Sequence, residues 1–524
     1  MVHQYKLNGY NIVIDTFSNS VHLVDDVAYD IIRLFCAESD SKNEGTFPSE
    51  ETVVSAILKN AADGVYGKSD SSISDSDIRE CYLDINGLIE AGKLFSEDVF
   101  KPNANVLKNR HTDIKALCLH VSHACDLTCS YCFAGQGRFN GPAALMSFDV
   151  AKRAIDFLVE NSGKKRNLEV DFFGGEPLLN FEVVKRTVEY ARSIEDAAGK
   201  NFRFTLTTNG MGITDEVIDF VNRECYNVVL SLDGRKEIHD MERKAAGSTV
   251  DGKVVPKGTG SFDIVVPKFR RLVAARTGRD MPKVDGLDDA IFPERDIPSW
   301  IARGRDTGNT NYYIRGTFTH FNPDFNEDIR HMLKLGFTEL SLEPVVCSSD
   351  SKFALTKEDL PVLLSQYEEL AVEMIDGKKK GAPFTFYHYM LNLKSGPCIY
   401  KRISGCGSGT EYFAVTPMGE LYPCHQFVGD EEYLMGDIWR GISEDKMPGC
   451  SRTGVEIRDE FKLCNVYARS ECDDCWAKLY CSGGCAANSY HAKGSILGVY
   501  DYGCELFKKR MECAIMMQVA EQEE

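Results

Sequence analysis

Hydrophobic and polar positions alternate with a period of two near the start of the chain. Within residues 4–24, the segments YNIVID and SVHLVD show this alternation and are joined by FSNS, so we expect short strands and a hairpin there. Segments with the helical period follow at about residues 26–36, 49–60 and 75–92. Strands followed by three short helices predict a winged-helix-like domain over residues 1–100, and a polar linker follows at 101–113.

From residue 114 the pattern changes to apolar runs that alternate with amphipathic helices. The six runs are IKALCLHV, LEVDFF, FRFTLTT, NVVLSL, YYIRGTF and LSLEPVV. Strict alternation of strand and helix predicts a parallel sheet with right-handed crossovers. Six units favour an α/β fold with an open, partial (β/α)6 barrel over residues 114–385, rather than a closed barrel of eight strands. Polar residues that follow the strands should then meet at one rim of the barrel.

The pattern is interrupted in two places. Residues 233–311 separate the fourth and fifth runs, and a helix at about 262–276 accounts for only part of them. The remaining insertion, about 245–311, is rich in Gly, Pro and Asp, and either a surface ornament without fixed structure or a contact with substrate fits it. Residues 386–524 are rich in Cys and Gly with weak periodicity, so we expect metal clusters rather than a large apolar core to organise them.

Charge excludes several classes of partner. The 524 residues include 60 Lys and Arg against 79 Asp and Glu, a net charge of −19 that opposes affinity for nucleic acid. Residues 1–100 alone carry 18 acidic and 7 basic side chains, which argues against a DNA-binding winged helix. No apolar run approaches the ~20 residues of a membrane span, and the N-terminal segment lacks the layout of a signal peptide. We therefore expect a cytoplasmic protein with no membrane partner.

Nineteen cysteines indicate metal binding, because disulfides are rare in the cytoplasm. Ten lie between Cys398 and Cys504, and three more lie in HACDLTCSYCFAG. This last segment follows the first predicted barrel strand and spaces its cysteines as C-x3-C-x2-C: Cys125, Cys129 and Cys132. Three thiolates can hold three irons of a [4Fe–4S] cluster and leave the remaining iron open to a chelating substrate. A zinc knuckle completed by His120 or His123 is the alternative.

Further candidates follow the next predicted strands. In FFGGEPLLN, Gly174 and Gly175 permit close backbone approach, and Glu176 offers a carboxylate to an ammonium group. Polar groups at the following strand ends suit ribose hydroxyls and a carboxylate, although turn-forming or structural roles are the alternative. These residues are Thr208, Asn209, Ser231, Asp233 and Arg315.

The cysteine loop, with Tyr131 before its last cysteine, resembles the radical S-adenosylmethionine (SAM) enzymes, and the GGE sequence matches a second motif of that family. The resemblance implies that SAM chelates the open iron through its amino and carboxylate groups. Electron transfer from the cluster would then cleave SAM to methionine and a 5′-deoxyadenosyl radical that abstracts hydrogen. It also implies that Tyr131 and the glycine and polar residues named above bind SAM, with Arg315 facing the methionyl carboxylate.

A second cysteine pattern resembles the SPASM extension of that family, which binds two auxiliary [4Fe–4S] clusters. Four-cysteine zinc ribbons are the alternative. The resemblance implies that the first auxiliary cluster is held by Cys398, Cys406, Cys424 and Cys485. The second would be held by Cys472, Cys475, Cys481 and Cys504. If Cys398 does not ligate, the first cluster has an iron open to a substrate thiolate. His425, next to Cys424, is either a proton carrier or a packed histidine.

Residues 1–100 resemble the recognition element of enzymes that modify ribosomally made peptides. Most of the chain, excepting parts of 245–311, resembles the maturases of six-cysteines-in-forty-five peptides. This implies intrapeptide thioether crosslinks between a Cys sulfur and a carbon of an acceptor residue in a Cys-rich precursor. The leader of that precursor would bind the N-terminal domain as an added strand, and flavodoxin or ferredoxin would supply electrons. The alternatives are a sulfatase-maturing enzyme that makes formylglycine and a non-catalytic iron–sulfur regulator.

Overall fold

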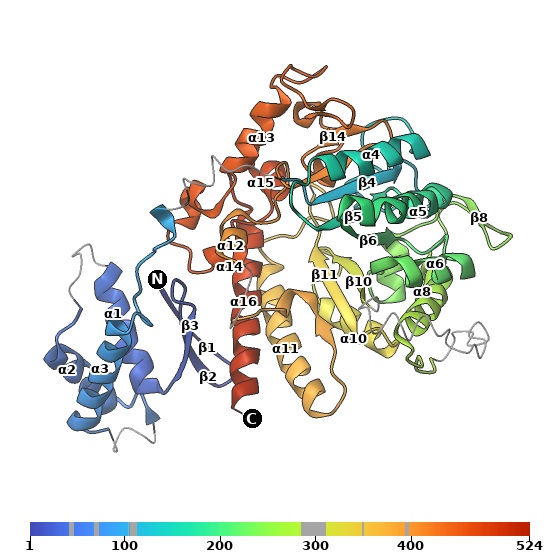
Figure 1. Cartoon of the computed structure of the whole chain (residues 1–524). Coiled ribbons are helices and arrows are strands. Elements are labelled where there is room, and N and C mark those ends of the chain that lie inside the picture. Colours follow the sequence, from blue (N-terminus) through green and yellow to red (C-terminus); the bar gives the residue numbers. More distant parts are fainter. Residues whose placement is uncertain are drawn as a thin grey trace.

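A small α/β domain forms the N-terminal part of the chain (Figure 1). In this computed structural model, the described residues are 1–40, 47–67, 73–102, 104, 113–284, 311–347, 350–393 and 398–523. An antiparallel sheet is ordered β1 (Val2–Leu7), β2 (Tyr10–Asp15), β3 (Ser20–Val24). Three helices follow: α1 (Asp26–Asp40), α2 (Glu50–Ala62) and α3 (Asp75–Glu90). The predicted strands and helices of this part are confirmed, and most of the predicted linker lies outside the described residues.

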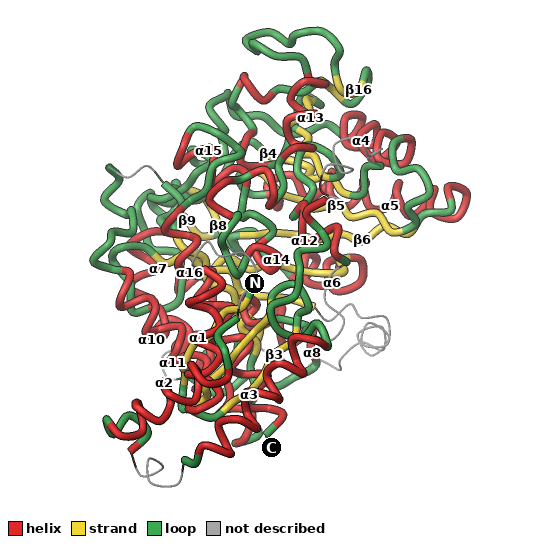
Figure 2. Tube along the Cα trace, turned by 90° about the vertical axis from the view of Figure 1, so that its left-hand side faces the viewer, coloured by secondary structure: helices red, strands yellow, loops and turns green. Residues whose placement is uncertain are grey.

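Six adjacent parallel strands form the centre of the molecule, in the order predicted from the sequence. They are β4 (Ala116–Ser122), β5 (Asn167–Gly174), β6 (Asn201–Thr208), β7 (Cys225–Ser231), β10 (Asn311–Phe318) and β11 (Glu339–Pro344). The helices that follow them are α4 (Phe148–Glu160), α5 (Phe181–Ala198), α6 (Asp215–Glu224), α7 (Lys236–Glu242), α8 (Phe262–Thr277), α10 (Phe325–Lys334) and α11 (Leu360–Lys379). Figure 2 shows this sheet from the side, with helices around it.

Side chains of the central strands divide between the helices and the interior of the barrel. Along β5 and β6 every second residue is buried, and Phe172 stacks on Phe204 with ring centroids 5.7 Å apart. These apolar rows pack under the helices because strand side chains alternate between the two faces. The other row of β5 and β6 is polar and partly exposed, and it includes Asp171 and Thr205. The interior of the barrel is therefore lined by polar groups.

The long fourth crossover contains the predicted helix and a hairpin. The helix is α8, and the hairpin pairs β8 (Ser248–Val250) with β9 (Lys253–Val255). A cavity of about 500 Å³ lies between this hairpin, α6 and α8, and Arg271 is one of its lining residues. None of the predicted site residues lines this cavity. The part of the predicted insertion at 285–310 lies outside the described residues.

The Cys-rich part continues the central sheet. Parallel to β11 runs β12 (Thr385–Phe386), and parallel to β4 runs β13 (Tyr412–Val415). Beyond β13 the sheet adds β14 (Glu420–Tyr422), β15 (Gly436–Asp437) and β16 (Gly441–Ile442). The sheet thus has eleven strands, five more than the six of the predicted barrel, and it crosses the predicted boundary at residues 385 and 386.

Helices of the Cys-rich part are α12 (Ile399–Ser404), α13 (Gly454–Leu463), α14 (Lys478–Cys481), α15 (Ala486–Lys493) and α16 (Asp501–Gln522). Short 3-10 helices are Pro177–Asn180 in the barrel and, in the Cys-rich part, Tyr387–Tyr389, His425–Phe427, Glu431–Tyr433, Val466–Ala468 and Ser470–Cys472. The expectation that this part has little apolar core was wrong for α16, which buries nine of its residues. Because α16 is buried on several sides, its sequence lacks the polar stripe of a surface helix.

The helix α16 also joins the N-terminal sheet to the barrel. On one side, His3 of β1 lies 3.0 Å from Glu512, and Tyr5 donates to the Glu512 carbonyl oxygen. On the other side, Arg510 donates to the hydroxyl of Tyr367 on α11. Among the described residues, no helix is long and apolar enough to cross a membrane.

Candidate active site

The loop that carries Cys125, Cys129 and Cys132 begins where β4 ends, at the rim of the barrel. The backbone N–H groups of Thr128 and Ser130 donate to the carbonyls of Lys244 and Glu242, at 2.7 and 3.0 Å. Burial raises the pKa of Cys129 to about 12, so deprotonation of this thiol depends on a bound cation. The loop is thus held in place by backbone contacts, and its three thiols lie together at the rim.

The Gly-Gly-Glu segment pairs directly with the start of this loop. The N–H of Gly175 donates to the Ser122 carbonyl at 2.8 Å, and the N–H of Glu176 donates to the Ala124 carbonyl at 2.9 Å. A Cβ atom on Gly174 or Gly175 would lie 2.2 Å from one of these carbonyl oxygens. Gly174 also has φ of +130°, which favours glycine. The predicted close backbone approach is confirmed.

Replacing Gly175 with alanine is expected to displace the cysteine loop, because the added Cβ atom would overlap the Ala124 carbonyl oxygen. Since backbone atoms have little room to yield, we expect a loss of roughly 1–3 kcal/mol of unfolding free energy and weaker iron binding at the loop. Thermal unfolding and iron analysis measure both. Gly87→Ala is the matched control, because no atom lies within 4 Å of its added Cβ atom. Equal stability and iron content in the two variants would contradict the prediction.

Glu176 is the centre of a buried polar network and is 1% exposed. Its carboxylate accepts from the hydroxyl of Thr208 and from the N–H of Asn209, each at 2.8 Å. The Asn209 side chain donates to Asp126 Oδ1 at 2.7 Å and to Cys125 Sγ at 3.6 Å. Burial, with a contribution from Asp126, raises the pKa of Glu176 to about 8. The structure therefore brings Glu176, Thr208 and Asn209 together beside the cysteine loop.

Tyr131 and Asp233 contact each other and a residue that the sequence did not indicate. The Tyr131 hydroxyl donates to Asp233 at 2.7 Å, and Arg243 donates to both carboxylate oxygens at 2.8 and 3.0 Å. The N–H of Thr317 donates to the same carboxylate at 3.0 Å. Burial alone would raise the pKa of Asp233, but Arg243 holds it below its usual value. This ion pair ties the cysteine loop to the ends of β7 and β10.

Ser231 and Arg315 are paired in register across β7 and β10. The Arg315 side chain is exposed although β10 lies inside the sheet, so it faces the open interior of the barrel. Among the described residues it makes no salt bridge, whereas nearby Glu343 pairs with His388 at 3.2 Å. Burial opposes the charged form of Glu343, but His388 holds its pKa below the usual range. Arg315 is thus available to an anionic group that enters the barrel.

His425 lies beside the cysteine loop and not only beside Cys424. Its ring centroid is 5.7 Å from Phe133, which follows Cys132, and 5.1 Å from Phe173 on β5. The Tyr412 hydroxyl lies 3.4 Å from His425 Nδ1. Burial lowers the pKa of His425 to about 4, so the ring is neutral at pH 7. The structure places this histidine between two groups of cysteines.

Asp171 is an interior carboxyl group that sequence analysis missed. It lies opposite Cys118 of β4 and Thr205 of β6 in the sheet. Burial, with a contribution from Glu169, raises its pKa to about 7. Along a predicted strand, charged residues that alternate with apolar ones usually face solvent, so they give only a weak indication of a functional site. Here the alternate face is the interior of the barrel.

The raised pKa of Asp171 gives a prediction about stability and pH. A carboxyl group that binds its proton more tightly in the folded state loses stability as pH rises from about 4 to 7. Asp171→Asn should remove this loss, so its unfolding free energy at pH 8 should exceed that of the parent by roughly 1–4 kcal/mol. Denaturant unfolding at pH 5 and pH 8 measures the difference. Asp149→Asn, an exposed position on α4, should not change it, and an equal effect in both variants would refute the prediction.

The auxiliary cysteines form two groups. In the second thiol group (Cys472, Cys475, Cys481 and Cys504), burial raises the pKa of Cys481 to about 12, and the three other thiols add to the rise. In the first thiol group (Cys406, Cys424 and Cys485), burial raises the pKa of Cys424, and the two other thiols add to it.

In a [4Fe–4S] cluster each thiolate binds its own iron, so the thiolates need not meet at one metal ion. Within the described ranges, no three His, Cys, Asp or Glu side chains are close enough to share one metal ion. Cys398 is exposed and lies at the start of α12.

One segment of the chain matches a known protein family. Residues 119–250 match the family described as "Radical SAM superfamily". This segment includes the cysteine loop, the Gly-Gly-Glu sequence, Asp233 and Arg243. The match identifies a radical SAM domain within this chain and supports an enzyme rather than the non-catalytic alternative.

Two relatives extend over three quarters of the chain, and a third matches a shorter segment. A "Cysteine-type anaerobic sulfatase-maturating enzyme" of Clostridium perfringens is 24% identical over 410 residues, which is 75% of this chain and 94% of that protein. A "Radical SAM cyclopropyl synthase TigE" of Paramaledivibacter caminithermalis is 28% identical over 411 residues, 75% of this chain and 72% of that protein. An uncharacterized protein of Methanocaldococcus jannaschii is 32% identical over 130 residues, 25% of this chain and 42% of that protein.

Among solved structures, the fold resembles "Native anSMEcpe with bound AdoMet" with a TM-score of 0.56. The match has 21% sequence identity and covers 78% of this chain and 100% of that chain. The likeness supports the α/β barrel fold.

Proposed function

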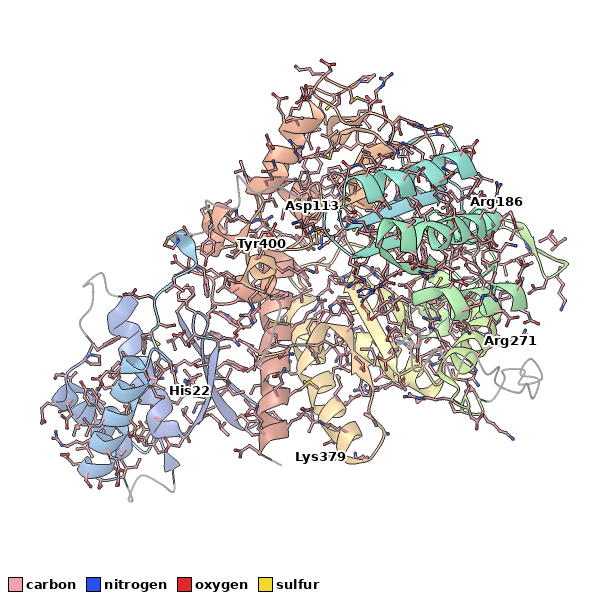
Figure 3. All side chains as sticks on the ribbon, viewed as in Figure 1. His22, Asp113, Arg186, Arg271, Lys379 and Tyr400 are labelled. Carbon is pink, nitrogen blue, oxygen red and sulfur yellow. The ribbon has the colours of Figure 1, made fainter. Side chains whose placement is uncertain are left out.

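We propose that this protein is a radical SAM peptide maturase that joins a Cys sulfur to a carbon of another residue within a ribosomally made, Cys-rich peptide. The observation that carries the proposal is the N-terminal domain beside a radical SAM barrel. Its β3 is an outer strand, and no described strand pairs with its other edge. Figure 3 marks His22 on this strand, and Arg271 on the far side of the barrel. An outer strand can accept the backbone of a leader peptide as an additional strand.

The residues present fit the cofactors of such an enzyme. Cys125, Cys129 and Cys132 would hold a [4Fe–4S] cluster, and Glu176 and Arg315 would bind the amino and carboxylate groups of SAM. Bound there, the cluster and SAM would supply the chemistry that removes a hydrogen atom from the acceptor residue. The first and second thiol groups would hold two further clusters.

The chain's own residues would position the peptide and move protons. Replacing a C–H and an S–H bond by one C–S bond removes two hydrogen atoms. One leaves with the deoxyadenosyl group, and the other leaves as a proton and an electron. His425, beside the cysteine loop, is the residue placed to carry this proton away from the reacting groups. The two auxiliary thiol groups would hold the clusters that supply a route for the electron.

A mass spectrum of a Cys-rich candidate peptide after anaerobic incubation with the reconstituted enzyme, SAM and reductant tests the proposal. We expect a loss of two hydrogens for each crosslink and a matching loss of alkylatable thiols. The Cys-to-Ala peptide is the control and should keep its mass. A product that has lost sulfur would instead favour the formylglycine-forming alternative. The similarity to the sulfatase-maturating enzyme of Clostridium perfringens is the reason to test for this product.

A further inference from the structure

A buried arginine in the Cys-rich part lacks a carboxylate partner. Arg469 is 2% exposed, and among the described residues it makes no salt bridge. Its guanidinium donates to the carbonyls of Gly483, Ile496 and Gly498 and to the hydroxyl of Ser489. Its Nε atom has no hydrogen-bond partner. Since a buried charge without a counter-ion is strongly destabilising, this arginine indicates an anion nearby.

The remaining partner of Arg469 is a thiol. Arg469 Nη2 lies 3.0 Å from Cys464 Sγ, and the same sulfur lies 3.4 Å from the Ile496 carbonyl oxygen. That carbonyl can accept the thiol hydrogen as long as Cys464 is protonated. When an iron replaces the hydrogen, the sulfur becomes an anion and Arg469 gains its counter-charge. Arginine donors to such a sulfur also orient the ligand and tune a cluster.

Three segments that carry the first thiol group converge on the segment of Cys464. A Cβ atom on Gly409, three residues after Cys406, would lie 2.7 Å from the ring of Phe461, three residues before Cys464. The ring centroid of Phe427, three residues after Cys424, is 5.6 Å from that of Phe461. Near Cys485, the hydroxyl of Ser489 donates to the Cys485 carbonyl at 3.0 Å and accepts from Arg469. The segments of all three cysteines therefore meet the segment of Cys464.

We propose that Cys464 is the fourth protein ligand of the first auxiliary cluster, with Arg469 as its buried counter-cation. This inference rests on the auxiliary clusters of the proposed function. It replaces the sequence-based expectation of Cys398. Cys398 is exposed and precedes α12, whereas Cys464 follows α13 and faces Arg469.

The test uses the full-length chain with Cys125, Cys129 and Cys132 replaced by alanine, so that only the auxiliary groups bind iron. This parent should hold about eight irons, four for each [4Fe–4S] cluster. Adding Cys464→Ala should lower the count to about seven or fewer and give the EPR signal of a three-iron cluster in the oxidised protein. Cys464→Ser should keep the iron, because an oxygen can still ligate, but should change the EPR spectrum of the reduced protein. Cys398→Ala should change neither the iron count nor the EPR spectrum.

Cys450→Ala is the matched control, since Cys450 is a buried thiol of the same part of the chain whose sulfur contacts the Glu432 carbonyl. If the Cys464→Ala chain had the same iron count and the same EPR spectrum as the parent, the inference would be overturned. The proposal of two auxiliary clusters would not be affected. The same holds if Cys398→Ala alone produces the three-iron signal. A parent that binds almost no iron would instead overturn the auxiliary clusters themselves. None of these readouts depends on a peptide substrate.

Discussion

A chain with Cys129 replaced by alanine is expected to form no detectable 5′-deoxyadenosine from SAM. The cysteine loop supplies only three thiols at the end of β4, and the network around Glu176 faces the same place. Without one thiolate the loop cannot hold a cluster that leaves a single iron open, so we expect at least a ~10³-fold loss of SAM cleavage. Chromatography of the deoxyadenosine formed under reductant measures this. Iron analysis should show about four irons fewer per chain.

Cys225→Ala is the control for this loss. Cys225 is a buried free thiol, but it lies at the start of β7, at the opposite end of the strand from the rim. The variant should keep its iron and its SAM cleavage, with a stability loss limited to a small cavity. SAM cleavage by Cys129→Ala at the parental rate would rule out the proposed cluster site.

Replacing Arg243 with methionine is expected to lower the unfolding free energy by about 3–5 kcal/mol. Asp233, which has no exposed surface, would lose both bonds from Arg243 and remain as a buried charge. The same change should loosen Tyr131, whose hydroxyl contacts that carboxylate, and so weaken iron binding in the adjacent loop. Denaturant unfolding of the anaerobic protein measures the first effect. EPR quantitation of the reduced cluster measures the second.

The double variant Asp233→Asn/Arg243→Met separates charge from packing. If the loss comes from an unpaired carboxylate, the neutral amide should restore much of the stability, because no buried charge remains. A double variant as unstable as Arg243→Met alone would mean that the packing of the arginine side chain matters instead. At low pH the single variant should approach the parent, because Asp233 owes its lowered pKa to Arg243 and that contribution disappears once the carboxyl is protonated.

The six central strands and the cysteine loop could be predicted from the sequence because each depends on local information. Runs such as LEVDFF have the composition of a buried strand, and cysteine spacing reports the shape of a single loop. The glycines of Gly-Gly-Glu were also predictable in their physical role, since Gly174 and Gly175 lie where a Cβ atom would collide with backbone. These features require no knowledge of distant contacts.

Contacts that depend on the assembled fold could not be predicted in this way. Arg243 lies in the long crossover, and nothing in its neighbourhood indicates that it pairs with Asp233. Asp171 is a charged residue in an apolar strand. Only the curvature of the sheet shows that its side chain lies inside the barrel. The helix α16 has apolar residues on several sides, so its sequence lacks the periodicity that identifies a surface helix. In each case the deciding partner is far away in the sequence.

Strand β13 fixes the distance between the cysteine loop of the barrel and Cys424 of the Cys-rich part. It pairs with β4 residue by residue, from Tyr412 opposite Ala116 to Val415 opposite Leu119. The cysteine loop follows β4, while β13 leads through β14 to Cys424, so the register of this pair sets the spacing of the two sites. A slip of one residue would move them by about 3.3 Å and turn each inward side chain outward. Chimeras that exchange C-terminal parts between relatives should therefore be joined outside β13, with the length of this strand kept constant.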